Sequence, residues 1–187
     1  KEKVIIYSTL QLYLWDRLDY LKGLHERARK GKFKIGMKLV RGAYMEKERE
    51  RAQQMGYPDP ICKDKDATDK NFDTVQQYMF DHIEDMAIFC GTHNEESSYL
   101  LMKMMKERNI EKKDPRVWFG QLYGMSDNIT FNLAQAGCSV SKYLPFGPIK
   151  DVIPYLMRRA QENSSMAGQT GRELGLIEKE LVRRRLK

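Results

Sequence analysis

Two adjacent arginines, Arg158 and Arg159, are the clearest candidates for binding chemistry. An arginine side chain is a planar fork of N–H donors, which fits a carboxylate or phosphate through paired hydrogen bonds. Consecutive helical residues point about 100° apart, so both side chains can meet only at a group beside their helix. Glu162 follows at helical spacing, and an exposed salt bridge contributing about 0.3–0.5 kcal/mol is the simpler interpretation from the residues alone. The helix is expected to bury an apolar stripe of Val152, Ile153, Leu156, Met157 and Ala160.

Two further cations, Lys38 and Arg41, fall in and just after an apolar segment. Lys38 stands between two apolar residues, and a buried cation is costly unless it meets an anion or a strong acceptor. Each residue therefore indicates either a structural ion pair or a bound anionic group. The neighbouring Gly42 and Ala43 would let a flat ligand approach the backbone closely.

A polar triplet, Thr92-His93-Asn94, follows another apolar segment. A lone histidine in such a place is more often a hydrogen-bonded structural residue than a catalyst. No second histidine or cysteine lies at ligand spacing, and Cys62, Cys90 and Cys138 are far apart, so no metal site is expected. No nucleophile elbow supports a Ser/His/Asp triad. The odd number of scattered cysteines favours a reducing compartment.

Short apolar runs alternate along the chain with longer stretches of helical spacing. Such alternation indicates repeated β-α units and hence a parallel sheet. The first helix is predicted by a stripe of Leu10, Leu14, Leu18 and Leu21. The five expected strands are residues 4–7, 35–40, 87–90, 117–119 and 140–144.

Polar residues gather where these strands are expected to end, which decides between two kinds of parallel fold. Open-sheet nucleotide binders usually carry a glycine-rich fingerprint, and the chain has neither a GxGxxG motif nor a P-loop. In β/α barrels, ligand groups occupy the carboxyl ends of the strands and the loops after them. We therefore expect an α/β fold of the (β/α)8 TIM-barrel type, of which this chain is the last five units, preceded by about three others. The strand-end polar groups are Ser8-Thr9-Gln11, Arg41 to Tyr44, Thr92 to Asn94, Gln121 to Gly124, and Tyr143 with Pro145 to Gly147.

Composition and charge argue against several classes of protein. The 187 residues are 41% hydrophobic and 32% charged, which is an ordinary globular composition. The longest apolar run, residues 86–90, is far shorter than the ~20 residues that cross a bilayer. The net charge of +7 comes partly from a basic helix predicted over residues 172–187. Because no RNA-binding motif accompanies this charge, it indicates solvated surface, and no nucleic-acid binding is expected.

Taken together, these motifs resemble the proline dehydrogenase family, including the barrel domain of bifunctional proline utilisation proteins. The resemblance runs from Val4 to Asn163 in the family's order. We therefore interpret residues 1–171 as the C-terminal part of such a barrel. The matching segments are Lys38 to Tyr44, Thr92 to Asn94, Gln121 to Met125, Tyr143 to Gly147 and Tyr155 to Asn163.

The resemblance implies a distorted (β/α)8 barrel that holds non-covalent FAD over the carboxyl ends of its strands. L-proline would pass a hydride from Cδ to flavin N5, giving Δ1-pyrroline-5-carboxylate, and the electrons would continue to a quinone. The catalytic residues would be Arg158 and Arg159, which clamp the proline carboxylate, and Tyr143, which packs against the ring. Leu122 and Tyr44 would line the substrate pocket. The FAD-binding residues would be Gln11, Lys38, Arg41, Gly42, Ala43, Thr92, His93, Arg159 and Glu162.

Several alternatives stay open beside this resemblance. Hydroxyproline dehydrogenase of the same family is the serious one, although Tyr143 should clash with a ring hydroxyl and thus favours plain proline. A non-catalytic nucleic-acid-binding module is supported by charge alone. The basic helix suggests peripheral contact with acidic lipid, with packing on the barrel as the competing interpretation. The expected location is the bacterial cytoplasm or inner-membrane surface, or the mitochondrial inner membrane or matrix. Because the family has further barrel units before these, the 187 residues alone are expected to be inactive.

Overall fold

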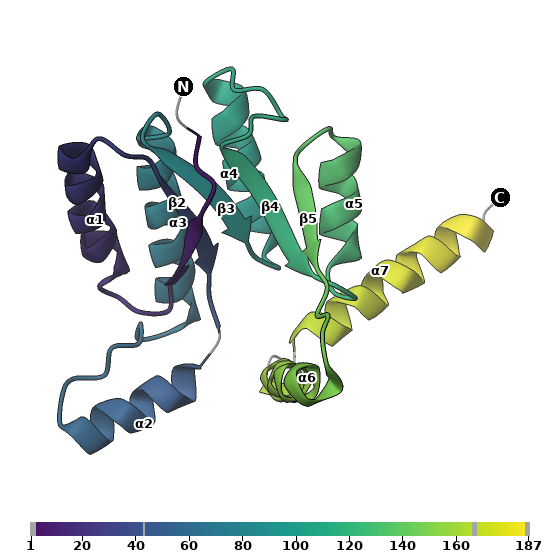
Figure 1. The fold of residues 1–187 in the computed structure, drawn as a ribbon. Helices are drawn as coiled ribbons and strands as arrows, with labels where there is room; N and C mark the ends of the chain where they lie inside the picture. Colours follow the sequence, from purple (N-terminus) through teal and green to yellow (C-terminus); the bar gives the residue numbers. More distant parts are fainter. Residues whose placement is uncertain (1–2, 43, 166–167, 186–187) are drawn as a thin grey trace. The chain divides into compact units, whose positions relative to one another are not determined.

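The structure is a computed structural model of the chain, drawn as a ribbon in Figure 1. It describes the backbone of residues 3–42, 44–165 and 168–185, and the side chains of residues 3–42, 44–160 and 174–184. The chain divides into two compact units, Lys1–Leu144 and Pro145–Lys187.

The first unit alternates strands with helices along the chain. Its strands form one sheet in the order β1-β2-β3-β4-β5, and every neighbouring pair is parallel. The predicted parallel sheet of five strands is therefore confirmed. The strands are β1 (Tyr7–Gln11), β2 (Ile35–Val40), β3 (Met86–Gly91), β4 (Val117–Leu122) and β5 (Val140–Tyr143). The helices are α1 (Arg17–Gly31), α2 (Met45–Met55), α3 (Lys65–Asp81), α4 (Glu95–Glu107) and α5 (Asp127–Gln135).

The first strand lies later in the chain than its apolar run predicted. Pairing with β2 begins only at Tyr7, while Ile5 and Ile6 are exposed. These two residues precede the segment whose register with β2 is paired. The predicted leucine stripe is divided as well, because Leu10 belongs to β1 and α1 begins only at Arg17.

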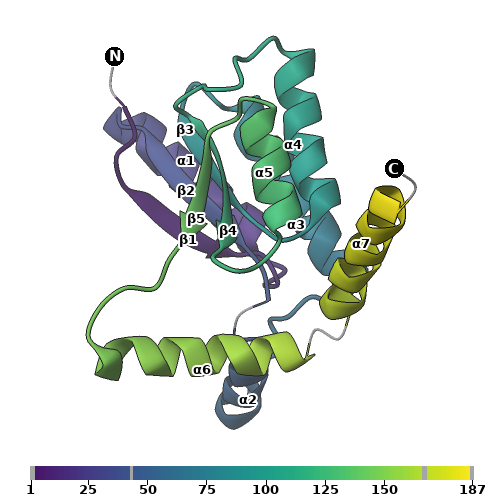
Figure 2. The same cartoon turned by 90° about the vertical axis from the view of Figure 1, so that its right-hand side faces the viewer.

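The two faces of the sheet differ, because successive side chains of a strand point to opposite sides. Helices α3, α4 and α5 lie on one face, and α1 packs beside α3 (Figures 1 and 2). Burying apolar side chains here stabilises the fold by roughly 25 cal/mol per Å² removed from water. The strand residues of this core are Leu10, Met37, Leu39, Met86, Ile88, Cys90, Val117 and Phe119.

The opposite face, which we call the open face, lies away from these helices (Figure 2). Lys38 is opposite Phe89 in the register, and Phe89 is opposite Trp118. A Cβ at Gly120 would come within 2.2 Å of the Phe89 ring, so glycine is needed there to leave space for the ring. The residues of the open face include Gln11, Lys38, Phe89, Trp118, Gly120, Leu122 and Tyr143.

All three cysteines of the chain are buried free thiols. Cys90 of β3 donates a hydrogen bond of 3.2 Å to the side-chain carbonyl of Gln76. Burial raises the pKa of Cys90 to about 12, so the thiol stays protonated at neutral pH. Burial likewise raises the pKa values of Cys62 and Cys138.

A polar cluster lies at the amino-terminal ends of β2 and β3. The buried His25 of α1 has Nδ1 2.9 Å from the Tyr78 hydroxyl and Nε2 3.1 Å from an Asp85 carboxylate oxygen. Asp85 also accepts a hydrogen bond of 2.7 Å from Lys34. The cluster therefore connects α1 and α3 to the segments that enter two strands.

The stability of the protein should fall when acid protonates this cluster. Hydrogen bonds from Lys34 and His25 lower the pKa of Asp85 to about 2, whereas an unfolded aspartate has a pKa of ~3.9. The stabilisation is therefore present above pH ~4 and is lost as the pH falls through about 2. In Asp85→Asn, the thermal midpoint should depend less on pH in this range than in the parent protein or in the exposed control Asp19→Asn. An equally steep acid dependence in Asp85→Asn would contradict the assignment.

The second unit contains helices α6 (Ile149–Ser165) and α7 (Gly168–Arg185). On α6, the side chains of Ile153, Leu156 and Met157 are exposed to 48%, 48% and 59%. The prediction that α6 buries its whole apolar stripe is therefore wrong for the described chain. Within the described residues, no helix combines the length and apolar character needed to cross a bilayer.

Candidate functional site

Lys38 is a cation on the open face with aromatic neighbours. Its Nζ lies 5.4 Å from the centroid of the Phe89 ring and 5.7 Å from that of the Tyr143 ring. These rings attract the ammonium, but burial lowers the pKa of Lys38. Among the described residues, Lys38 forms neither an ion pair nor a hydrogen bond. Of the two alternatives that the sequence left, this arrangement favours a bound group over a structural ion pair.

Gln11 presents an unmet acceptor on the same face. It ends β1, opposite Val40 in the register. Its Oε1 is buried and has no hydrogen-bond partner in the described part of the chain. Such an acceptor costs about 1–3 kcal/mol, which the N–H of a ligand would offset. Leu122 and Tyr143 are register partners at the ends of β4 and β5, so the strand ends bring these predicted site residues to one face.

Arg41 reaches the helical layer. Its Nη1 donates to Asp69 at 2.5 Å, and its Nη2 donates to the hydroxyls of Thr92 at 3.1 Å and Ser97 at 2.8 Å. The guanidinium carbon lies 4.1 Å from the centroid of the Phe72 ring. For Arg41, the structure thus shows the structural ion pair that was one of its two interpretations.

These bonds continue into the turn after β3. The Ser97 hydroxyl donates to Asp73 at 2.7 Å. The Thr92 hydroxyl accepts a bond of 3.1 Å from the backbone N–H of Asn94, and the Asn94 side chain caps α4 by accepting from the backbone N–H of Ser97. The guanidinium therefore fixes the turn on which His93 lies.

His93 is held from the other side by a residue that the sequence analysis did not name. Its Nδ1 lies 2.9 Å from Oγ of Ser126, in the loop after β4. Burial, followed by the positive charge of Lys142, lowers the pKa of His93 to about 4. The imidazole is therefore neutral at pH 7.

Lys142 was also missed by the sequence analysis. Its Nζ donates to the backbone carbonyls of Met125 at 2.5 Å and Leu122 at 3.3 Å, and it forms an ion pair of 2.6 Å with Asp127. The signal was present, because Lys142 interrupts a predicted strand just as Lys38 does.

Ser126 adopts an unusual backbone conformation for this contact. It occupies the N-cap position of α5 with φ +50°, and its side chain makes no capping hydrogen bond. A non-glycine residue in the left-handed region costs about 1–3 kcal/mol, and a serine N-cap usually contributes ~1 kcal/mol. The hydroxyl of Ser126 contacts His93 instead of capping the helix. A strained backbone conformation of this kind is typical of functional sites.

The loop after β2 also leaves the ordinary backbone region. Gly42 has φ +97°, which favours glycine. Tyr44 has φ +66° at the N-cap of α2, and its ring lies 5.9 Å from Lys47 Nζ. Ala43 lies outside the described residues. Both Gly42 and Tyr44 follow β2, which ends at Val40, so they lie after the end of a strand as the sequence predicted.

The two predicted clamp residues belong to the second unit. Arg158 and Arg159 are half-buried on α6. The Nε of Arg158 is buried and has no hydrogen-bond partner among the described residues. The guanidinium carbon of Arg159 lies 5.5 Å from the centroid of the Tyr155 ring, one helical turn earlier. The side chain of Glu162, the predicted salt-bridge partner, lies outside the described residues.

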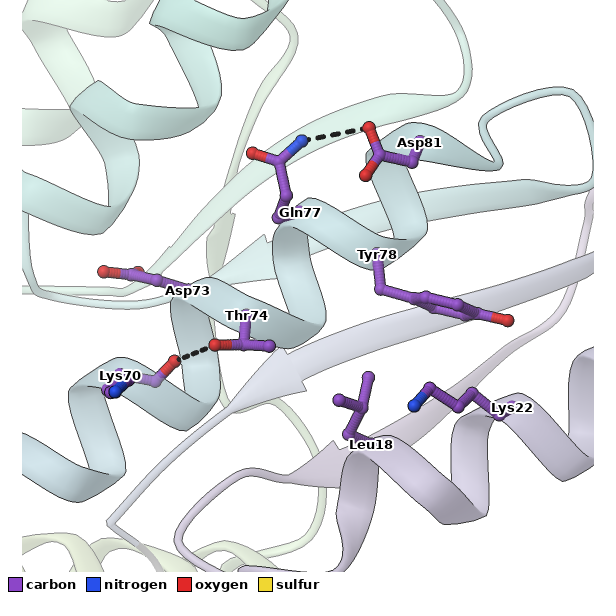
Figure 3. A pocket seen from close by; sticks show the side chains of 8 residues that line it. All are labelled: Leu18, Lys22, Lys70, Asp73, Thr74, Gln77, Tyr78 and Asp81. Atoms are coloured by element: carbon purple, nitrogen blue, oxygen red, sulfur yellow. Dashed lines mark hydrogen bonds between the residues drawn. The ribbon is translucent and has the colours of Figure 1, made fainter.

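A shallow groove of about 740 Å³ lies between α1 and α3. Figure 3 shows two side chains of α1 facing the polar residues of α3. Bonds from Thr74 to the Lys70 carbonyl and from Gln77 to Asp81 stay within α3. None of the predicted site residues lines this groove. In the described chain, no group of three or more His, Cys, Asp or Glu side chains is placed to hold a metal ion.

Comparisons with known proteins show the family to which the sequence is related. The sequence model of the family described as "Proline dehydrogenase" matches residues 1–172. Human "Proline dehydrogenase 1, mitochondrial" is 42% identical over 186 residues, which are 98% of this chain and 31% of the human protein. "Hydroxyproline dehydrogenase" of Xenopus laevis is 42% identical over 183 residues, which are 96% of this chain and 39% of that protein. The chain thus spans about a third of the length of these relatives.

Solved structures show the same fold. The crystal structure of proline utilization A from Bdellovibrio bacteriovorus, inactivated by N-propargylglycine, superposes with a TM-score of 0.77. The match has 28% sequence identity and covers 84% of this chain and 16% of that one. The expected α/β fold of the TIM-barrel type is therefore confirmed for the part of the barrel that this chain contains.

Proposed function

Because the chain belongs to the proline dehydrogenase family, we propose that the whole protein oxidises L-proline to Δ1-pyrroline-5-carboxylate. The reaction removes a hydride from Cδ and a proton from the amine nitrogen, which leaves a C=N bond. FAD would supply the hydride acceptor, and a quinone would take up the electrons afterwards. Residues 1–171 would belong to the barrel and residues 172–187 to a basic helix.

The observation that carries this proposal is the pair of unmet polar groups on the open face. Gln11 offers a buried acceptor that lacks a donor, and Lys38 offers a cation that lacks an anion among the described residues. A flavin ring has both N–H and C=O groups along one edge, so the two side chains fit it. Gly42 lets the backbone of the β2 loop come close to such a ring.

The cofactor would be held mainly from the ends of β1, β2 and β3. A cation beside the ring stabilises the negative charge of the reduced state, and Lys38 would supply it. Arg41 uses three of its five N–H donors on protein groups, so two remain for FAD. The other residues that we assign to FAD are Ala43, Thr92, His93, Arg159 and Glu162.

The substrate would be held by its carboxylate and its ring. Arg158 and Arg159 would bind the carboxylate through paired hydrogen bonds. Tyr143 would pack against the proline ring and exclude water, which hydride transfer requires. Leu122, the register partner of Tyr143, would line the pocket together with Tyr44.

Anaerobic addition of L-proline to the full-length protein tests the proposal. The purified protein should be yellow. After L-proline is added, its visible flavin absorbance should disappear because the cofactor is reduced. Addition of L-alanine, which has the carboxylate but no ring, serves as the control. A full-length protein that folds but is colourless, even after incubation with FAD, would overturn the flavin assignment.

Hydroxyproline is the second candidate substrate, because the Xenopus relative named hydroxyproline dehydrogenase is as similar as the human relative. We favour proline, since Tyr143 packed on the ring would leave no space for a hydroxyl. The bleaching assay with trans-4-hydroxy-L-proline separates the two. Faster reduction by hydroxyproline than by proline would reverse the preference.

The location and the electron acceptor follow from the same proposal. Names of relatives place them in mitochondria, and we propose the mitochondrial inner membrane or matrix for a eukaryotic source and the cytoplasm or inner-membrane surface for a bacterial one. Peripheral contact through the basic α7 would bring the protein to membrane quinone. On this helix, Arg183 and Arg184 pair with Glu180 at 2.6 Å and 2.9 Å, which reduces the charge available to lipid.

A further inference from the structure

The hydrogen bond between His93 and Ser126 has a direction that the surroundings determine. Ser126 is only 8% exposed, so its hydroxyl hydrogen needs an acceptor. In the described chain, Nδ1 of His93 is the partner of this hydroxyl, at 2.9 Å. The hydroxyl therefore donates to Nδ1, and the proton of the neutral imidazole lies on Nε2.

The Nε2–H group of His93 is the second observation. It has no hydrogen-bond partner among the described residues, although the side chain is half-buried. His93 follows the carboxyl end of β3, where barrels bind their ligands. The protein thus leaves one oriented donor at the site, suited to an oxygen acceptor.

Lys142 of β5 holds the loop that carries Ser126. Its ammonium is bound by the carbonyls of Leu122 and Met125 and by the carboxylate of Asp127. These three groups flank Ser126 in the β4–α5 loop. One side chain therefore holds the loop and places a fixed positive charge near the imidazole, where a second proton would be repelled.

Two other charged side chains near the turn have partners of their own. Arg41 is bound to Asp69, and Glu95 accepts a hydrogen bond of 2.6 Å from Asn128. The charged side chains on the elements around His93 include Arg41, Lys65, Asp69, Asp73, Glu95, Glu96, Asp127 and Lys142.

We propose that Lys142 is a positioning residue that, by holding the loop of Ser126, keeps His93 neutral with its proton on Nε2, ready to donate to an oxygen of the bound cofactor. The identity of that acceptor rests on the proposed function, whereas the tautomer and the charge of His93 can be measured independently of it. Loss of Lys142 should therefore make His93 easier to protonate and make cofactor binding more sensitive to acid below about pH 5.

The test is an NMR titration of the full-length protein labelled with ¹⁵N-histidine, with His93→Gln used to assign the signals. In the parent protein, the ¹⁵N shifts should show the Nε2–H tautomer, and His93 should remain neutral down to the pKa of about 4. In Lys142→Met, the titration midpoint should rise by about one pH unit. The FAD dissociation constant of this variant should increase about tenfold from pH 7.5 to pH 4, against about twofold in the parent protein, as expected for a pKa that is higher by about one unit.

Matched variants distinguish the loss of the Lys142 charge and its hydrogen bonds from a general disturbance of the fold. Lys142→Arg keeps a cation on the same strand and should retain most of the parental titration. Lys70→Met removes an exposed lysine from α3 and should leave His93 unchanged. If Lys142→Met titrates like the parent protein while its circular dichroism is unaltered, the proposal is overturned. An Nδ1–H tautomer in the parent protein overturns it as well, even if no variant at position 142 folds.

This experiment is independent of the proposed reaction. Failure of L-proline to bleach the protein would count against the dehydrogenase while leaving the titration of His93 interpretable. A normal bleaching reaction with an unshifted His93 would reject the role of Lys142 alone.

Discussion

Arg158→Met in the full-length protein is expected to raise the KM for L-proline by about 10- to 100-fold. A hydrogen bond to a charged group contributes about 1.5–3 kcal/mol, which corresponds to this range. The effect should fall mainly on KM, because the carboxylate is bound similarly before and during hydride transfer. Arg158→Lys should restore only part of the affinity, since lysine keeps the charge but lacks the planar fork. Initial rates with an artificial electron acceptor measure both constants.

Two controls distinguish the clamp from an effect on the helix. Lys150→Met removes an exposed cation from the same α6 and should leave the KM unchanged. Pyrrolidine has the ring of proline without its carboxylate, so its binding should be insensitive to Arg158→Met. A KM for proline that stays the same in Arg158→Met would restore the alternative in which the arginines form surface salt bridges with Glu162.

Arg41→Met should lower the free energy of unfolding by about 3 kcal/mol, as breaking a buried ion pair does. The substitution leaves the carboxylate of Asp69 without its cation and the hydroxyls of Thr92 and Ser97 without their donor. Methionine fills a similar volume, so packing on Phe72 is largely preserved. Equilibrium unfolding in urea gives the change directly, at constant m-value.

The controls for Arg41 use its own neighbours. Lys65 is the second cation on Asp69, but 76% of its side chain is exposed, so Lys65→Met should cost less than about 1 kcal/mol. Arg41→Lys keeps the charge and should lie between the parent and Arg41→Met. Unchanged stability together with loss of FAD in Arg41→Met would instead make Arg41 primarily a cofactor ligand.

The sequence predicted β2, β3 and β4 because each contains a short apolar run with side chains buried in the core, and it predicted β5 although that strand is only partly buried. It failed at β1, where the same kind of run at Val4 to Ile6 is not the strand. Strand limits depend on the register with the neighbour, and the residues that face β2 begin at Tyr7. A local pattern cannot contain that information.

The candidate site, like the strands, was only partly predictable from the sequence. Lys38 and Arg41 look alike as cations near an apolar run, yet one lies on the open face and the other is bound by Asp69. Only the faces of the folded sheet separate them. Ser126 carries no signal in the sequence, because its role depends on a left-handed backbone angle and on His93, which lies 33 residues earlier.

The alternation of side chains along β3 bears on how the protein would be protected against the redox chemistry that we propose for it. Phe89 lies on the face proposed to hold the flavin, and the next residue, Cys90, lies behind the sheet with a protonated thiol. Oxidants attack the thiolate form, so one layer of backbone shields this sulphur from peroxide formed beside the ring. All three cysteines are buried with raised pKa values, so we expect no thiol switch in this part of the protein.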